Sequence, residues 1–150
     1  MSTRRLSASV LAFALVVAGC EKEPEYYPVQ GKLTVNKVPL LAVNVQFVPD
    51  PAKGNTSPEE ARGWVDRETG TYTLKTTKAG DKLQKDTKAG CRPGWYKVVV
   101  FAFEEQKPSE GPKPPKWLAS QKYADPRTTE LSVEVTADPK PGQYDFDLKP

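Results

Sequence analysis

The sequence predicts an all-β protein in which a single seven-stranded antiparallel β-sandwich follows an N-terminal signal peptide. The chain has 15 prolines and 10 glycines, which divide it into short segments. These segments carry Val, Tyr, Phe and Thr at alternating positions, a pattern typical of strands. No segment after Cys20 repeats its apolar residues with a helical period. Seven short strands within one domain favour two antiparallel sheets on a shared core.

The first residues have the pattern of an export signal. Arg4 and Arg5 precede an apolar run that is shorter than the roughly 20 residues of a membrane span. The exit Val17-Ala18-Gly19-Cys20 resembles a bacterial lipobox. That resemblance implies cleavage before Cys20 and lipidation of its sulfur with acyl chains such as palmitate. The alternatives are an ordinary secretory signal with an incidental Cys20, an uncleaved N-terminal helix and a twin-arginine signal.

Three segments follow from these patterns. Residues 1–19 are the expected lipoprotein signal peptide, residues 20–28 the lipidated Cys and a short tether, and residues 29–150 the β-sandwich domain. Glu21 to Tyr27 would span at most about 25 Å. We therefore expect an exported protein, lipid-anchored to a bacterial membrane on its periplasmic or cell-surface side.

The N-terminal half of the domain contains four expected strands. Residues 29–35 and 43–48 alternate on either side of a turn around Pro39. A polar loop follows over residues 51–60. Residues 63–66 and 71–76 then flank a connector that ends in Gly70, as in a short hairpin with one residue at positive φ.

The C-terminal half contains the other three expected strands. Residues 95–103 form the longest apolar run and follow the turn Pro93-Gly94. Residues 130–136 and 143–148 alternate on either side of a Pro- and Gly-containing turn. The alternation predicts this core: Val29, Leu33, Val45, Phe47, Trp64, Tyr72, Leu74, Tyr96, Val98, Val100, Leu131, Val133, Phe146 and Leu148.

Composition excludes several kinds of site. Without Arg4 and Arg5, the 22 basic residues fall to 20, against 19 acidic ones, and they are spread along the chain. We therefore expect no nucleic-acid partner. The chain has no histidine, which removes His-dependent nucleophile systems and His zinc sites, so we expect no metal and no cofactor. If Cys20 is lipidated, Cys91 has no intramolecular partner, and we expect it to pack in the core.

Several motifs resemble a known fold family. Val29-Gln30-Gly31-Lys32-Leu33-Thr34, the hairpin from Asp66 to Leu74 and the strand entry Pro93-Gly94-Trp95-Tyr96 resemble carboxypeptidase regulatory-like, transthyretin-like (prealbumin-like) sandwich domains. The segments from Lys122 to Leu131 and from Phe146 to Leu148 resemble small planctomycete-type exported lipoproteins. The resemblance implies a transthyretin-like or Ig-like Greek-key sandwich. One departure is Val38, where the family's first turn usually has Gly.

The leading hypothesis is a non-catalytic, lipid-anchored envelope lipoprotein whose sandwich acts as a structural or protein-interaction module. Its partners would be the membrane and an unknown envelope protein or glycan. We expect no enzyme, since the hydroxyisourate hydrolases of the transthyretin-like fold rely on histidine. Asp66, Glu68 and Asp125 could pair for acid–base chemistry, but turn carboxylates are usually solvated.

Three other features are candidate sites. A carbohydrate-binding module at the cell surface is the alternative function, with Trp117 and Tyr123 as the aromatic residues that would contact a ligand or partner. Calcium would find oxygen ligands in aspartates that lack the spacing of a known loop, namely Asp50, Asp66, Asp81 and Asp86. The Pro- and Lys-rich loop of residues 104–121 is either a polyproline II ligand or a solvated connection.

Overall fold

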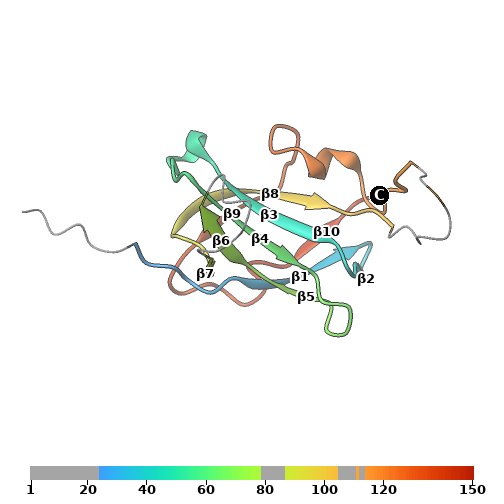
Figure 1. Ribbon diagram of the computed structural model, residues 1–150, viewed down its shortest axis with the longest axis horizontal. Helices are drawn as coiled ribbons and strands as arrows, with labels where there is room; N and C mark the ends of the chain where they lie inside the picture. Colours follow the sequence, from blue (N-terminus) through green and yellow to red (C-terminus); the bar gives the residue numbers. More distant parts are fainter. Residues whose placement is uncertain (1–23, 79–86, 105–110, 112–113) are drawn as a thin grey trace, which may run out of the picture.

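The computed structural model describes residues 24–78, 87–104, 111 and 114–150. The expected signal peptide, Cys20 and residues 105–110 and 112–113 of the loop at 104–121 lie outside this part. Two β-sheets pack face to face (Figure 1), which confirms the all-β sandwich class. Among the residues described, no helix is long and apolar enough to span a membrane.

The larger sheet has six strands in the order β7-β6-β4-β3-β8-β9. All of its neighbouring strands pair antiparallel. Its edges are the very short β7 and the C-terminal β9. The strands are β3 (Asn44–Pro49), β4 (Glu59–Trp64), β6 (Lys75–Lys78), β7 (Lys88–Ala89), β8 (Gly94–Phe101) and β9 (Ser132–Val135).

The smaller sheet is built around β1 (Gln30–Val35), which pairs with three other strands. β2 (Val38–Pro39) and β5 (Thr71–Thr73) pair antiparallel with it, whereas β10 (Phe146–Leu148) pairs parallel. The expectation of a purely antiparallel sandwich is therefore wrong at this pair. The reason lies in the connection, because β10 enters the sheet from β9 in the opposite sheet rather than through a hairpin.

The described residues form ten strands rather than the expected seven. The segment 71–76 is two strands, because the chain passes from the small to the large sheet at Leu74. The buried Leu74 donates its N–H to Val29 O at 3.0 Å, and its carbonyl accepts from Gly90 N at 2.9 Å. The other additions are the two-residue strands β2 and β7. β4 also begins at Glu59, inside the stretch expected to be a loop.

Phe47 lies at the centre of the core between the sheets. Its ring centroid is 5.9 Å from that of Tyr96 and 6.4–6.5 Å from those of Tyr72, Tyr144 and Phe146. The predicted core residues are buried with three exceptions. Leu131 and Phe146 are partly buried against the core, whereas Trp64, at 67% exposure, is on the surface and was assigned wrongly.

Close packing at Gly31 of β1 allows β5 on one side of this strand to contact the segment before β10 on the other side. A Cβ here would clash with the carbonyl of Tyr144 and contact the Tyr72 hydroxyl. In the space that glycine leaves, Tyr72 Oη donates to Tyr144 O at 2.6 Å. Burial raises the pKa of Tyr72 well above its ordinary value, which keeps the donor protonated.

Candidate functional site

The two aromatic residues predicted to bind a ligand have different environments. Tyr123 lies in a short 3₁₀ helix, Gln121–Ala124, and is only 2% exposed. Its hydroxyl accepts a long bond of 3.3 Å from Lys149 N. Trp117 is half-buried and packs edge-to-face on Phe103, with ring centroids 5.9 Å apart. A sugar ring therefore finds no exposed face on Tyr123, and the two residues do not form a joint platform.

The candidate carboxylates have local structural roles. Asp66 Oδ1 accepts from the backbone N–H and the hydroxyl of Thr69 at 2.8 and 3.0 Å and from Glu68 N at 2.9 Å, and these bonds lower the pKa of Asp66. Asp125 pairs with Arg127 at 2.6 Å, which lowers the pKa of that carboxyl to about 2. Both carboxylates are stabilised as anions by hydrogen bonds within their own turns. These bonds stabilise the turns, and the lowered pKa values make both groups weak bases for proton transfer.

Asp50, one of the proposed calcium ligands, has a local structural role like that of Asp66. Asp50 is buried and caps the 3₁₀ turn Pro51–Lys53 by accepting from Ala52 N at 3.1 Å. Asp81 and Asp86 lie outside the described residues. Within the described part of the chain, no group of three or more His, Cys, Asp or Glu side chains is placed to hold a metal ion.

Cys91 is a core residue, as expected. It is 0% exposed, and burial raises the pKa of its thiol to about 12. A thiol of this kind is a poor nucleophile, because only the thiolate reacts readily. Its backbone has a second role, since Cys91 and Tyr27 exchange hydrogen bonds of 2.8 and 2.9 Å.

The two hydrogen bonds between Tyr27 and Cys91 fix the segment that precedes β1 to one end of the sandwich. Tyr26 Oη donates to Glu59 Oε2 at 2.8 Å, and Arg92 forms a two-pronged ion pair with the same carboxylate at 2.7 and 3.1 Å. We call the segment Pro24–Pro28 the strap. It leads into β1 beside β7 (Figure 1). The tether inferred from the sequence is therefore bound to the domain from Tyr26 onward.

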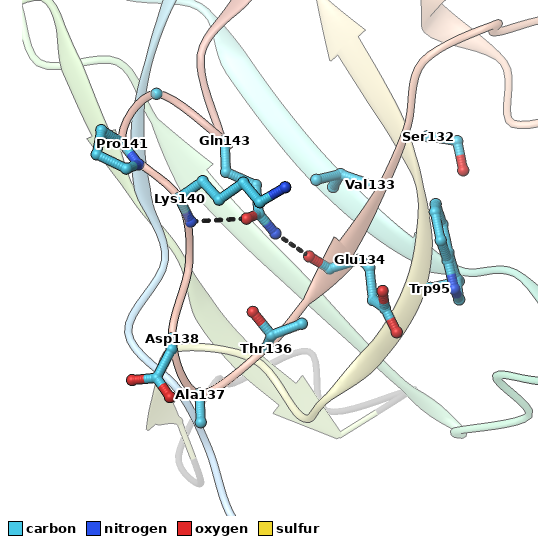
Figure 2. A pocket seen from close by; sticks show the side chains of 11 residues that line it. Trp95, Ser132, Val133, Glu134, Thr136, Ala137, Asp138, Lys140, Pro141 and Gln143 are labelled. Carbon is cyan, nitrogen blue, oxygen red and sulfur yellow. Dashed lines mark hydrogen bonds between the residues drawn. The ribbon is translucent and has the colours of Figure 1, made fainter.

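A groove runs along β9, and Figure 2 shows its lining. Its volume is about 870 Å³. One wall is β9 with Trp95 of β8 beside it, and the other is the turn from Lys140 to Gln143. We call it the β9 groove.

The β9 groove exposes backbone groups of an edge strand. Val98 N donates to Leu131 O, so in an antiparallel ladder the odd-numbered residues of β9 face β8. The backbone groups of Ser132 and Glu134 then point to the free edge. Gln143 confirms this direction, because its Nε2 donates to Glu134 O at 2.7 Å (Figure 2).

The end of the β9 groove near Trp95 carries a cation. Lys53 Nζ lies 3.8 Å from the centroid of the Trp95 ring and donates to Ser132 Oγ at 2.9 Å. The Trp95 carbonyl is bound by Asp50 N at 3.0 Å and by Asn55 Nδ2 at 2.9 Å. This rim of the groove is therefore held by several hydrogen bonds from the segment after β3.

A second hollow lies on the outer face of the six-stranded sheet. Its volume is about 490 Å³, and Trp64 is its single aromatic residue. Apart from Gly63, the rest of its lining is polar and includes Asn44, Arg62 and Lys75. We call this surface the Trp64 face.

The sequence around Trp64 carries a signal for its exposure. In β4, Ala61 and Gly63 alternate with Arg62 and Trp64. The small residues are buried and the other two are exposed. Alternation therefore placed Trp64 on the face of a charged residue, and hydrophobicity alone was misleading.

Comparisons with protein-family models, with curated proteins and with solved structures found no match to this chain.

Proposed function

We propose that this protein is a non-catalytic, lipid-anchored lipoprotein of the bacterial cell envelope whose β-sandwich is a protein-interaction module. In this proposal the fold is the transthyretin-like sandwich that the sequence motifs resemble. The observation that carries the interaction role is the free edge of β9, which borders a groove of about 870 Å³. An extended peptide can pair with such an edge through main-chain hydrogen bonds.

The lipid anchor is supported by the sequence from Arg4 to Cys20, and the position of the strap would set how close the domain lies to the membrane. If Cys20 carries acyl chains, only Glu21 to Glu25 separate it from Tyr26, which is bound to Glu59. Five residues span at most about 18 Å. The strap end of the sandwich would then face the lipid, and the rest of the domain would face the envelope space.

The β9 groove suits a peptide strand for three reasons. Its backbone groups at Ser132 and Glu134 point away from β8, so an added strand would not disturb the sheet. One of these groups, the carbonyl of Glu134, accepts a single side-chain hydrogen bond from Gln143. A main-chain N–H of the peptide can replace this donor at little cost. Lys53 at the Trp95 end favours a peptide with an acidic residue there.

The test removes one outward N–H from the edge. Glu134→Pro deletes the N–H of Glu134 but leaves the ladder with β8, because proline is tolerated at a free edge. Glu134→Gln is the matched control, since it removes the charge and keeps the N–H. The full lipidated chain is solubilised in detergent and used to capture proteins from the envelope.

We expect Glu134→Gln to keep the captured partner and Glu134→Pro to lose it by at least about tenfold. Gln143→Ala should strengthen capture, because it frees the carbonyl of Glu134. Equal capture by the proline and glutamine variants would show that the partner does not pair with β9, and the proposal would fail.

A further inference from the structure

We propose that the Trp64 face binds an acidic glycan, that is, a chain of pyranose rings that carry carboxylate groups. The indole of Trp64 would stack on the apolar face of a sugar ring, and Arg62 with Lys75 would bind its carboxylate. This surface differs from the β9 groove in its residues and its ligand class, so it stands independently of the peptide-binding role.

The position of Trp64 gives it an open ring among hydrogen-bonding groups. It is 67% exposed and directly opposite Asn44 of β3 in the antiparallel ladder. Thr73 and Thr77 contribute hydroxyl groups to the same hollow. Sugars require this combination, because each ring has an apolar face for stacking and a rim of hydroxyls for hydrogen bonds.

The charges on the Trp64 face point to an anionic ligand. Arg62 of β4 and Lys75 of β6 are directly opposite each other, and both are exposed. Like charges at directly opposed positions destabilise a sheet. The charge of Arg62 is offset by its 3.1 Å ion pair with Glu60. None of the ion pairs among the described residues involves Lys75. A ligand carboxylate between the two cations would relieve this repulsion and form charge-assisted hydrogen bonds.

The location within the sheet favours a glycan over a peptide. β4 pairs with β3 up to Trp64 and with β6 up to Arg62, and the bridge between Val65 and Tyr72 continues the second side just beyond Trp64. An added peptide strand has no free backbone edge at Trp64 and would have to bind through side chains alone. A sugar ring needs no backbone pairing, and the strands around Trp64 give a firm surface for stacking.

Binding is measured with the full lipidated chain in detergent micelles. The probes are a panel of uronic acid and acidic amino-sugar oligomers, neutral oligomers of equal length, and an acidic hexapeptide. The variants are Trp64→Ala and Lys75→Gln. The controls are Lys32→Gln, which removes an exposed cation from the smaller sheet, and Glu134→Pro in the β9 groove. Circular dichroism and urea unfolding check that each variant remains folded.

We expect at least one acidic oligomer to bind, with affinity falling about tenfold or more in Trp64→Ala and about fivefold in Lys75→Gln. Binding should also weaken with salt, and neither control should change it. The inference is overturned if no acidic oligomer binds in a Trp64-dependent way or if neutral oligomers bind equally well. It is likewise overturned if the acidic peptide competes at the same site with equal or higher affinity.

Discussion

The hydrogen bond between Tyr72 and Tyr144 offers a quantitative test of how the small sheet is held together. In Tyr72→Phe the ring stays, and only the hydroxyl that donates to Tyr144 O at 2.6 Å is lost. Tyr72 is 0% exposed, so water does not readily replace the donor. A net hydrogen bond contributes about 1 kcal/mol, and an unsatisfied buried carbonyl costs about 1–3 kcal/mol. We expect the free energy of unfolding to fall by about 2 kcal/mol.

Urea unfolding measures this change directly. With a slope near 2 kcal/mol per molar urea, a loss of about 2 kcal/mol lowers the midpoint by about 1 M and leaves the slope unchanged. Tyr27→Phe is the matched control, because it removes the same hydroxyl from a bond to Glu25 on the surface. Its midpoint should equal that of the wild type within error. If both variants shift equally, burial does not set the strength of the Tyr72 bond and the reasoning is refuted.

The pH dependence supplies a second measurement on the same variant. Burial raises the pKa of Tyr72 in the folded protein, so the folded state holds this proton more tightly than the unfolded state. The resulting stability is present below about pH 10 and is lost as pH rises toward the folded pKa. Tyr72→Phe should therefore flatten the alkaline decline of stability. Part of the decline should remain, because the pKa values of Cys91 and Tyr96 are also raised, each to about 12.

Three further predictions concern the anchor, the packing and the acid range. Cys20→Ser should move the protein from the membrane to the soluble or unprocessed fraction, measured by fractionation and mass spectrometry; normal processing and membrane retention would contradict lipidation. Gly31→Ala should lower the free energy of unfolding by about 2 kcal/mol or more, since its Cβ would clash with Tyr144 O, and an unchanged urea midpoint would disprove that packing. Asp147→Asn should flatten the acid decline of stability in urea titrations. Bonds from Lys37 and Thr34 lower the pKa of Asp147, so its contribution is present above about pH 4 and is lost as pH falls toward the folded pKa. A steeper decline in the variant would contradict this assignment.

The faces of most strands could be read from the sequence. Val45 and Phe47 in β3, and Val133 and Val135 in β9, are buried as their alternation indicates. The connector that ends in Gly70 was also predicted, and this residue has a φ of 65°. These features depend on residues close together in the chain, because the side-chain period of a strand is two.

The candidate binding surfaces were harder to predict. Trp64 is hydrophobic, and only its partnership with Arg62 on one face of β4 indicated exposure. The groove beside β9 depends on which strand ends a sheet, and this is set by pairing between segments far apart in the chain. The aromatic rings of Trp117 and Tyr123 predict ligand contacts, but the burial of Tyr123 depends on packing in the tertiary structure.

The sequence by itself determined the all-β class, most strand faces, several turns and the expectation of a lipid anchor at Cys20. Each of these comes from the spacing of residues in one short stretch. The tertiary structure alone decided that β10 pairs parallel to β1, that the chain changes sheets at Leu74 and that β9 has a free edge. The physical reason is that any strand can pair with many others through the same backbone hydrogen bonds. Burial of the shared core around Phe47 selects among these pairings, and it is a property of the whole fold.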